Sequence, residues 1–248
     1  MAVALVTGAA GGLGAAVARR LAADGHRVAL NDRPDRDVSG LVRELDGLAA
    51  PADVADPDAV AAMVAEVESV TGTHVGILVA GATHLTTAPF GEHDPGDWWR
   101  VIDVDLGGTF ACAQAVMPGM VERGGGRMVL IASEGGLIGM PGATACSAAK
   151  AGIVTLAKSL GRELAPLGIA VNAIAPSVID TPRLAAMAAD TGISADEFRA
   201  RQAARVPLGR VASPAEIAEA VAFLADERMP TLVGQILHAD GGSTRARA

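Results

Sequence analysis

The chain has 248 residues, 50% of them hydrophobic, and a formal net charge of −8. This length is sufficient for one large α/β core, while the acidic charge and the absence of a basic run argue against nucleic acid and anionic membrane partners. No apolar stretch is long enough to cross a bilayer, and no signal-peptide pattern follows Met1. Because Cys112 and Cys146 lack metal-ligand spacing, we expect no metal site and a cytoplasmic protein with reduced thiols.

Short apolar segments alternate with longer alanine-rich segments of helical periodicity along the whole chain. Continuous apolar strands separated by helices are typical of a parallel sheet that is covered on both faces. Since crossovers between parallel strands are right-handed, residues 1–248 are predicted to form a single doubly wound Rossmann-type sheet, an α/β fold. The expected strands are Val3–Val6, Arg27–Asn31, Gly47–Ala50, Val75–Ala80, Arg127–Ala132, Ile169–Ala173 and Gln235–His238, and the expected helices are Gly12–Ala23, Pro57–Val70, Pro95–Glu122, Thr144–Ala165 and Pro214–Ala225.

A glycine-rich turn, TGAAGGLG at residues 7–14, joins the first expected strand to the first expected helix. Glycines at this spacing allow a tight turn, close approach of the backbone to a pyrophosphate, and close packing of helix on strand. The helix N-terminus would donate its N–H groups to the phosphates. We therefore predict that Gly8, Gly12, Leu13 and Gly14 bind a dinucleotide.

Two acidic residues follow the next two strands. Asp32 can accept hydrogen bonds from the adenosine ribose and would repel a 2′-phosphate, which favours NAD over NADP. Arg33 argues the other way, because a neighbouring arginine can accept that phosphate. The pair Asp53-Val54 is placed to meet the adenine, although an aspartate before a helix is also an ordinary cap.

One long interruption, about residues 181–207, separates the sixth strand from the last helix. Ligands of open α/β sheets bind beyond the carboxyl ends of the strands, so an insertion there is predicted to be a mobile substrate lid. The alternatives are a solvated helical hairpin or a subunit contact. Four apolar residues suggest an apolar pocket beside it: Met140, Leu184, Met187 and Phe198.

These motifs together resemble the short-chain dehydrogenase/reductase family over the whole chain. Ser133 lies thirteen residues before Cys146, and Lys150 lies four residues after it, which matches the family's Ser…Tyr-x-x-x-Lys spacing. Similar matches are the cofactor turn at residues 7–14, the pair Asp53-Val54, the segment IAPSVIDTP at residues 174–182 and the segment DGG at residues 240–242.

The resemblance implies hydride transfer between a nicotinamide and a carbonyl or hydroxyl carbon of a small molecule. In the family, serine polarises the substrate oxygen, tyrosine is the acid/base, lysine lowers the tyrosine pKa and holds the ribose, and asparagine orders a water. The resemblance also implies a homodimer or homotetramer, formed through Pro95–Glu122 and Thr144–Ala165 and through the C-terminal strand. Further cofactor contacts are implied at Ala80, Gly81, Lys150, Pro176, Val178 and Thr181.

The chain departs from the family at the active site. Position 146 is cysteine and the chain contains no tyrosine, while position 105 is aspartate in place of asparagine. The family's Asn-Asn-Ala-Gly reads LVAG at residues 78–81, and its Pro-Gly reads Pro-Ser at residues 176–177.

Cys146 differs from a tyrosine in both acidity and length. A thiol has a reference pKa of about 8.5 against about 10 for a phenol, and Lys150 nearby is expected to favour the thiolate. The sulfur is one bond from Cβ, however, so it would stop several ångströms short of the usual carbonyl position. Either a water bridges the gap, the substrate sits deeper, or Cys146 is a small buried helix residue.

Each of the other site residues also has a structural alternative. Eighteen of the 20 basic residues are arginine, so Lys150 indicates a retained cofactor contact, unless it is one of two chance lysines. Ser133 is otherwise a strand-end serine, and Asp105 either pairs with Lys150 or caps local backbone. His84 and His93 flank the expected mouth and could donate a proton, or are solvated. Three residues are expected to be structural: Trp98 and Trp99 as anchors of the long helix, and Cys112 in the core.

Three functions follow from this pattern. The preferred hypothesis is an NAD(P)(H)-dependent oxidoreductase with Ser133, Cys146, Lys150 and Asp105 in its catalytic site and a proton donated by water, Cys146 or the substrate. The second is a non-redox enzyme, such as an isomerase, dehydratase or cyclase, on the same scaffold. The third is a catalytically silent binding subunit.

Overall fold

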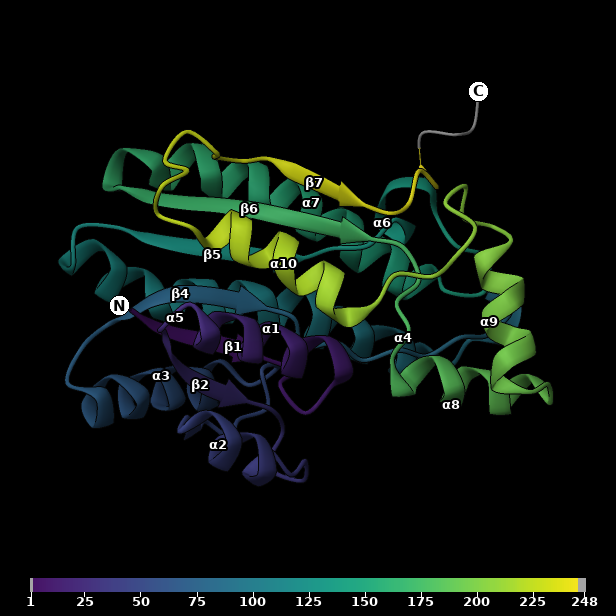
Figure 1. Cartoon of the computed structure of the whole chain (residues 1–248), viewed down its shortest axis with the longest axis horizontal. Coiled ribbons are helices and arrows are strands. Elements are labelled where there is room, and N and C mark those ends of the chain that lie inside the picture. Colours follow the sequence, from purple (N-terminus) through teal and green to yellow (C-terminus); the bar gives the residue numbers. More distant parts are fainter. Residues whose placement is uncertain (1, 245–248) are drawn as a thin grey trace.

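The computed structural model describes residues 2–244. A seven-stranded parallel sheet has the order β3-β2-β1-β4-β5-β6-β7 (Figure 1), so the predicted doubly wound α/β fold is confirmed. Two predicted strands have the expected bounds, and β6 extends furthest beyond its prediction. The strands are β1 (Val3–Thr7), β2 (Arg27–Asn31), β3 (Leu48–Ala49), β4 (Val75–Ala80), β5 (Gly126–Ile131), β6 (Ile169–Pro176) and β7 (Ile236–Ala239).

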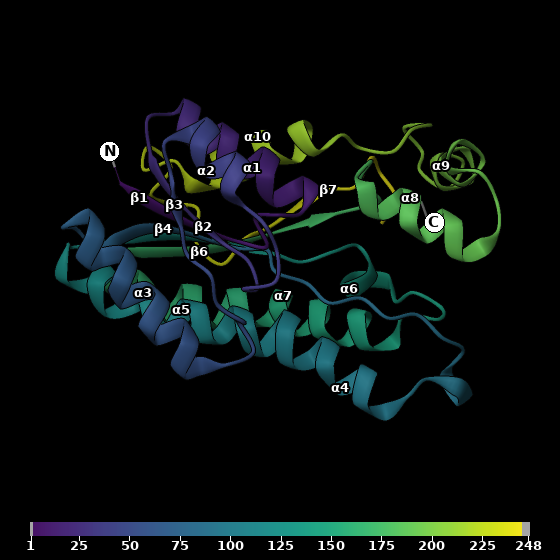
Figure 2. The same ribbon diagram turned by 90° about the horizontal axis from the view of Figure 1, so that it is seen from below.

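Helices cover both faces of the sheet (Figure 2). On one face lie α1 (Gly12–Ala23), α2 (Ser39–Leu45) and α10 (Pro214–Ala225), and on the other lie α3 (Pro57–Thr71), α4 (Pro95–Ile102), α5 (Gly108–Glu122) and α7 (Thr144–Leu164). Strand β1 packs against the helices on both faces of the sheet. Its side chains alternate between the two faces, so that Leu5 packs toward α3 and α5, and Val6 packs toward α1 and α10.

The predicted helix Pro95–Glu122 has the expected ends and its backbone is helical throughout, but it is not α-helical over its whole length. A π-helical turn, Asp103–Gly107, separates α4 from α5. Its extra residue per turn leaves no trace in the apolar periodicity, and such turns are frequent at functional sites. The π turn directs the Asp105 side chain into the protein, where it is 0% exposed.

The insertion at residues 181–207 contains two helices, α8 (Pro182–Thr191) and α9 (Ala195–Ala203). Both stand beyond the carboxyl ends of the strands (Figure 1). The two ends of the insertion are joined at its base, because the Asp180 N–H donates to the Ala212 carbonyl at 2.8 Å and the Ala212 N–H donates to the Val178 carbonyl at 3.1 Å. The insertion therefore leaves the sheet and returns to it at one point.

The chain's two asparagines form side-chain hydrogen bonds at the two edges of the sheet. Asn31 donates to the carbonyls of Ala50 and Ala52 at 2.9 and 3.1 Å, which ties β2 to the chain beyond β3. Asn172 on β6 donates to the Leu232 carbonyl at 2.7 Å and accepts from the Gln235 N–H at 2.9 Å. Side-chain amides thus reinforce both short edge strands.

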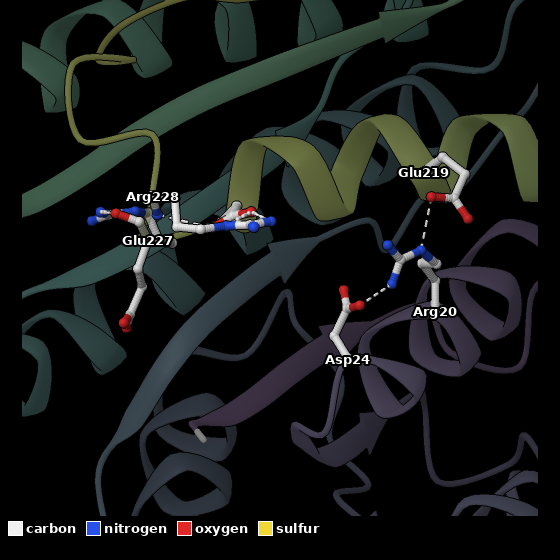
Figure 3. Close-up of polar contacts among 7 residues, drawn as sticks. Arg20, Asp24, Glu219, Glu227 and Arg228 are labelled. Carbon is white, nitrogen blue, oxygen red and sulfur yellow. Dashed lines mark hydrogen bonds and ion pairs between the residues drawn. The ribbon is translucent and has the colours of Figure 1, made fainter.

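Many of the ion pairs join exposed side chains, and Figure 3 shows one group of such contacts. Arg20 on α1 pairs with Asp24 of the same helix and, at 2.8 Å, with Glu219 on α10. Exposed pairs of this kind contribute about 0–1 kcal/mol, so the apolar packing of α1 against α10 dominates their contact. Across residues 2–244, no helix has both the length and the hydropathy needed to span a bilayer.

Candidate active site

The site begins where the strand order reverses, between β1 and β4. In a doubly wound sheet the loops at this point diverge, and ligands usually bind in the crevice between them. The Thr7 hydroxyl at the end of β1 accepts from the Gly81 and Ala82 N–H groups at 3.0 and 3.1 Å, and so ties the two loops together. Ala80, the last residue of β4, is buried directly beneath.

The glycine-rich turn forms a cradle of backbone atoms. Gly8 has φ +73°, and a Cβ on it would lie 2.9 Å from the Gly81 carbonyl oxygen. A Cβ on Gly14 would lie 2.2 Å from the Gly8 oxygen, so only glycine permits this packing. Within the described chain no side chain caps α1, whereas Asp56 and Ser213 cap α3 and α10. The N–H groups that open α1 are therefore suited to bind a phosphate, and Leu13 is half-buried among them.

The start of α8 faces this cradle. A Cβ on Gly12 would lie 3.1 Å from both Thr181 Cβ and Pro182 Cδ, so the N-termini of α1 and α8 are in close proximity. Thr181 precedes α8 without capping it in this structure, which leaves its hydroxyl for other partners. Pro176 ends β6, where its carbonyl accepts from the Glu134 N–H at 2.9 Å, and Val178 packs against the apolar cluster of the insertion.

Asp32 directly follows β2 and lies beside the cradle. Its carboxylate accepts from the Ala10 N–H and from the Arg33 N–H, both at 2.9 Å. The Arg33 guanidinium is directed to Asp35 at 2.9 Å. A negative charge thus stands at the place expected for the adenosine ribose, and the neighbouring cation is already paired.

Asp53 has other partners. It pairs with Arg100 at 2.5 Å and accepts from the Ala55 N–H at 3.0 Å, while the cap of α3 is Asp56. Val54 is 4% exposed, and a Cβ on Gly108 would lie 2.5 Å from its Cγ2, so the turn is packed against the start of α5. The adenine contact stays a prediction.

A buried ion pair occupies the centre of the catalytic region. Lys150 Nζ lies 3.2 Å from Asp105 Oδ2 and donates to the Ile131 carbonyl at 3.0 Å. Asp105 also accepts from the Thr83 hydroxyl at 2.7 Å and from the His84 N–H at 2.8 Å. Of the alternatives for Asp105, pairing with Lys150 is therefore the one observed. The carboxylate is satisfied by charged and neutral donors, and the lysine is held toward the end of β5.

Cys146 lies one helical turn before Lys150 on α7. Burial raises the pKa of its thiol, Lys150 lowers it and Asp105 raises it, with a net increase. Lys150 thus acts in the expected direction and favours the thiolate, but burial, the largest cause, and Asp105 raise the pKa of the thiol by more than the lysine lowers it. Cys146 is a neutral thiol near pH 7. Burial also raises the pKa of Cys112 to about 12, which agrees with its expected place in the core.

Ser133 follows β5 at the same edge of the sheet. Its hydroxyl oxygen accepts from the Gly135 N–H at 3.1 Å, at the start of the short helix α6 (Gly135–Ile138). This contact orients the oxygen and leaves the hydroxyl proton to donate elsewhere.

The aromatic and histidine side chains near the mouth have structural contacts. Trp98 donates from its indole to the Thr144 hydroxyl at 3.2 Å and meets Trp99 edge to face, with centroids 4.9 Å apart. This confirms that Trp98 anchors the start of α4, and ties it to α7. The His93 ring contacts the Thr86 hydroxyl at 2.9 Å. In the described part of the chain, no group of His, Cys, Asp and Glu could hold a metal ion.

One site residue, Thr83, was missed in the sequence. Thr83 lies two residues beyond the LVAG segment at residues 78–81. It is outside the positions that match the family's motif, so the motif did not indicate it. The helix start at Thr181-Pro182 was also missed, although it has the same Pro-at-first-turn pattern as Asp56-Pro57. Applied here, that signal would have predicted a helix beginning inside the site.

Comparisons with known proteins agree with this geometry. The sequence model of the family described as enoyl-(acyl carrier protein) reductase matches residues 8–244. Cis-4-hydroxycyclohexanecarboxylate dehydrogenase of Sinomonas cyclohexanicum is 41% identical over 247 residues, 98% of this chain and 96% of the relative. A 3-oxoacyl-(acyl-carrier-protein) reductase of Staphylococcus aureus is 36% identical over 96% of each chain.

A solved structure shows the same architecture. Actinorhodin polyketide ketoreductase, crystallised with NADPH, superposes with a TM-score of 0.93 at 36% identity, covering 98% of this chain and 97% of that one. The crevice, the glycine cradle and the Ser133 and Lys150 positions thus occur in a chain that matches these oxidoreductases from end to end. The chain belongs to the short-chain dehydrogenase/reductase family and is an oxidoreductase of that type.

Proposed function

We propose that the protein transfers hydride between NAD(H) and a carbonyl or hydroxyl carbon of a small molecule. The observation that carries this proposal is the convergence, at one edge of the sheet, of the backbone cradle with Ser133 and Lys150. The dinucleotide, when bound, supplies or accepts the hydride. A non-redox enzyme or a silent binding protein would not require the cradle, Ser133 and Lys150 together.

The preference for NAD rests on Asp32. Its carboxylate stands beside the cradle, where it would bond ribose hydroxyls and repel a 2′-phosphate, and Arg33 is engaged by Asp35. The ketoreductase named above was crystallised with NADPH. The preference is therefore proposed for this chain on its own residues.

We assign the chain's residues as follows. Ser133 donates its hydroxyl proton to the substrate oxygen, and Lys150 bonds the cofactor ribose. Asp105, with no solvent exposure, is a positioning residue that acts through Lys150. Because the Cys146 thiol is neutral and short, the proton is carried by a water in the space that a tyrosine ring would fill.

Restoring the tyrosine tests this assignment. With NADH and 4-oxocyclohexanecarboxylate, chosen from the name of the 41% identical relative, we expect wild-type protein to oxidise the cofactor slowly. A positioned general acid contributes typically about 10²–10⁴-fold, so Cys146→Tyr is expected to raise kcat at least about tenfold. Cys146→Ala is expected to retain the wild-type rate, since the thiol does not carry the proton.

Two outcomes would contradict the proposal. Tight NADH binding without wild-type turnover on a panel of carbonyl compounds, together with turnover by Cys146→Tyr, would exclude the redox function. Loss of activity in Cys146→Ala would assign the proton to the thiol instead of to water.

The cofactor preference has its own test. Wild-type protein is expected to bind NADH at least about tenfold more tightly than NADPH in fluorescence titrations, a difference of 1.4 kcal/mol or more. Asp32→Ser should narrow this ratio, because the 2′-phosphate is no longer repelled. Asp24→Ser, which removes a carboxylate at the far end of α1, is the control and should leave the ratio unchanged. A ratio that does not move in Asp32→Ser would remove the basis for the NAD preference.

We further propose that the protein is a homodimer or homotetramer, as the sequence led us to expect. Large apolar side chains remain exposed on the helices of the predicted interface: Trp99 on α4, and Phe110 and Val121 on α5. Sedimentation analysis would test this proposal.

A further inference from the structure

Cys146 and Lys150 occupy the same face of α7, one helical turn apart. A long side chain on a helix points back toward the helix N-terminus, so the Lys150 side chain is directed toward the turn that carries Cys146. Lys150 is 5% exposed and Cys146 is half-buried, so water screens their interaction less than it would at the surface. A positive charge at this place favours ionisation of an acid at position 146.

Asp105 brings the opposite charge to the same place. Its Oδ2 lies 3.2 Å from Lys150 Nζ, and its side chain has no exposed surface. The Thr83 hydroxyl donates to Oδ2 at 2.7 Å and the His84 N–H donates to Oδ1 at 2.8 Å, so both carboxylate oxygens are held in place. The ion pair has no net charge, and the Coulomb effects of its two members on a neighbouring acid have opposite signs.

Several groups act on the Cys146 thiol. Burial has the largest effect and raises the pKa of the thiol. Among the charged groups of the described chain, Lys150 and Arg183 lower that pKa, whereas Asp105 raises it. The lysine and the aspartate of the ion pair thus act in opposite directions on the same atom.

We propose that Asp105 cancels the effect of the Lys150 charge at position 146, so that the aspartate at 105 and the cysteine at 146 are one coupled departure from the family. Lys150 is then retained for the cofactor and does not activate an acid on α7. Asp105 is a positioning residue, since it acts through the lysine and sets the protonation state at position 146. An acid placed there stays protonated near neutral pH, which suits donation of a proton to a substrate oxygen. The inference deepens the proposed oxidoreductase function, on which its kinetic consequence rests.

The absence of tyrosine from the chain allows a direct test, because Cys146→Tyr introduces the only phenol. Ionisation of this phenol is followed by ultraviolet difference absorbance as the pH is raised, without cofactor or substrate. Adding Asp105→Asn to Cys146→Tyr is expected to lower the titration midpoint by about one pH unit or more, since a nearby opposite charge changes a pKa by roughly 1–3. Adding Lys150→Met instead is expected to raise the midpoint.

Removing both ions completes the comparison. The variant with Cys146→Tyr, Asp105→Asn and Lys150→Met is expected to titrate within about half a pH unit of Cys146→Tyr alone, because the two opposing effects are lost together. Asp103→Asn is the matched control, since Asp103 lies on the same π turn but is exposed, and it should leave the midpoint of Cys146→Tyr unchanged. Circular dichroism establishes that each variant is folded.

An unchanged midpoint in the folded Asp105→Asn variant would overturn the proposal. A shift of equal size in Asp103→Asn would also overturn it, because the effect would then not depend on the ion pair. If Asp105→Asn did not fold in the presence of Lys150, the comparison would be made without the lysine. Adding Asp105→Asn to the Cys146→Tyr, Lys150→Met variant must then lower the midpoint, and equal midpoints would exclude an effect of Asp105 on position 146.

A kinetic measurement separates this coupling from hydride transfer. Oxidation of an alcohol requires the phenol to have lost its proton, so Cys146→Tyr should oxidise 4-hydroxycyclohexanecarboxylate with NAD faster as the pH is raised. Asp105→Asn should shift this pH–rate profile down together with the absorbance midpoint. A shift in absorbance without any oxidation of the alcohol would support the coupling and contradict the proposed oxidoreductase function.

Discussion

Replacing Lys150 by methionine is expected to destabilise the protein by about 3 kcal/mol or more, because it leaves Asp105 buried without its counter-ion. Asp105 is 0% exposed and would retain only the Thr83 hydroxyl and the His84 N–H as donors. Chemical denaturation with an unchanged m value measures this loss. Lys158→Met is the matched control, since Lys158 is the only other lysine and is exposed on the same helix, and it should stay within about 0.5 kcal/mol of wild type.

A second substitution separates stability from cofactor binding. Asp105→Asn together with Lys150→Met removes both buried charges, so the double variant is expected to recover most of the lost stability. It should not recover NADH affinity, because the lysine proposed to bond the ribose is still absent. If Lys150→Met were as stable as Lys158→Met, the ion pair would make no net contribution.

Gly14→Ala is expected to disrupt the cofactor cradle. The new Cβ would lie 2.2 Å from the Gly8 oxygen, 2.8 Å from the Gly8 carbonyl carbon and 2.9 Å from Ala9 Cα. All three are backbone atoms, so relief requires the turn to open, with an expected destabilisation of about 3 kcal/mol and a loss of NADH binding. Thermal unfolding and NADH fluorescence titration measure the two effects separately.

Gly40→Ala is the control for the glycine substitution. Gly40 lies in α2 with a negative φ, and a Cβ there would meet nothing within 4 Å in the described structure. Alanine is favoured over glycine in helices by up to about 1 kcal/mol, so this variant should be slightly stabilised with unchanged NADH affinity. Wild-type stability and NADH affinity in Gly14→Ala would contradict the close packing at the turn.

The glycine cradle and the Lys150–Asp105 pair are both expected to affect cofactor binding. The cradle at the ends of β1 and β4 is proposed to bind the dinucleotide, and the ion pair with Asp105 holds Lys150 near the end of β5. Disrupting the cradle should abolish cofactor binding. Changing the Lys150–Asp105 pair should alter both cofactor affinity and the free energy of unfolding.

Several elements could be predicted because their signals are local. Helices α1 and α10 have the predicted bounds, since a glycine turn opens the first and a Ser-Pro cap opens the second. Strands β2 and β4 were also predicted with their observed bounds, because apolar segments end there at polar or glycine residues. By contrast, α2 spans only seven residues, and its apolar side chains Leu41, Val42 and Leu45 are half-buried against the core, so its periodic signal is short.

The sequence by itself determined the doubly wound fold, the glycine-rich turn, the acidic residue after β2 and the missing tyrosine. Only the tertiary structure decided which partners the charged groups meet. The π turn brings Asp105 to Lys150, and the burial of Cys146 raises the pKa of its thiol. The physical reason is that periodicity and capping are properties of neighbouring residues, whereas burial and ion pairing depend on segments far apart in the chain.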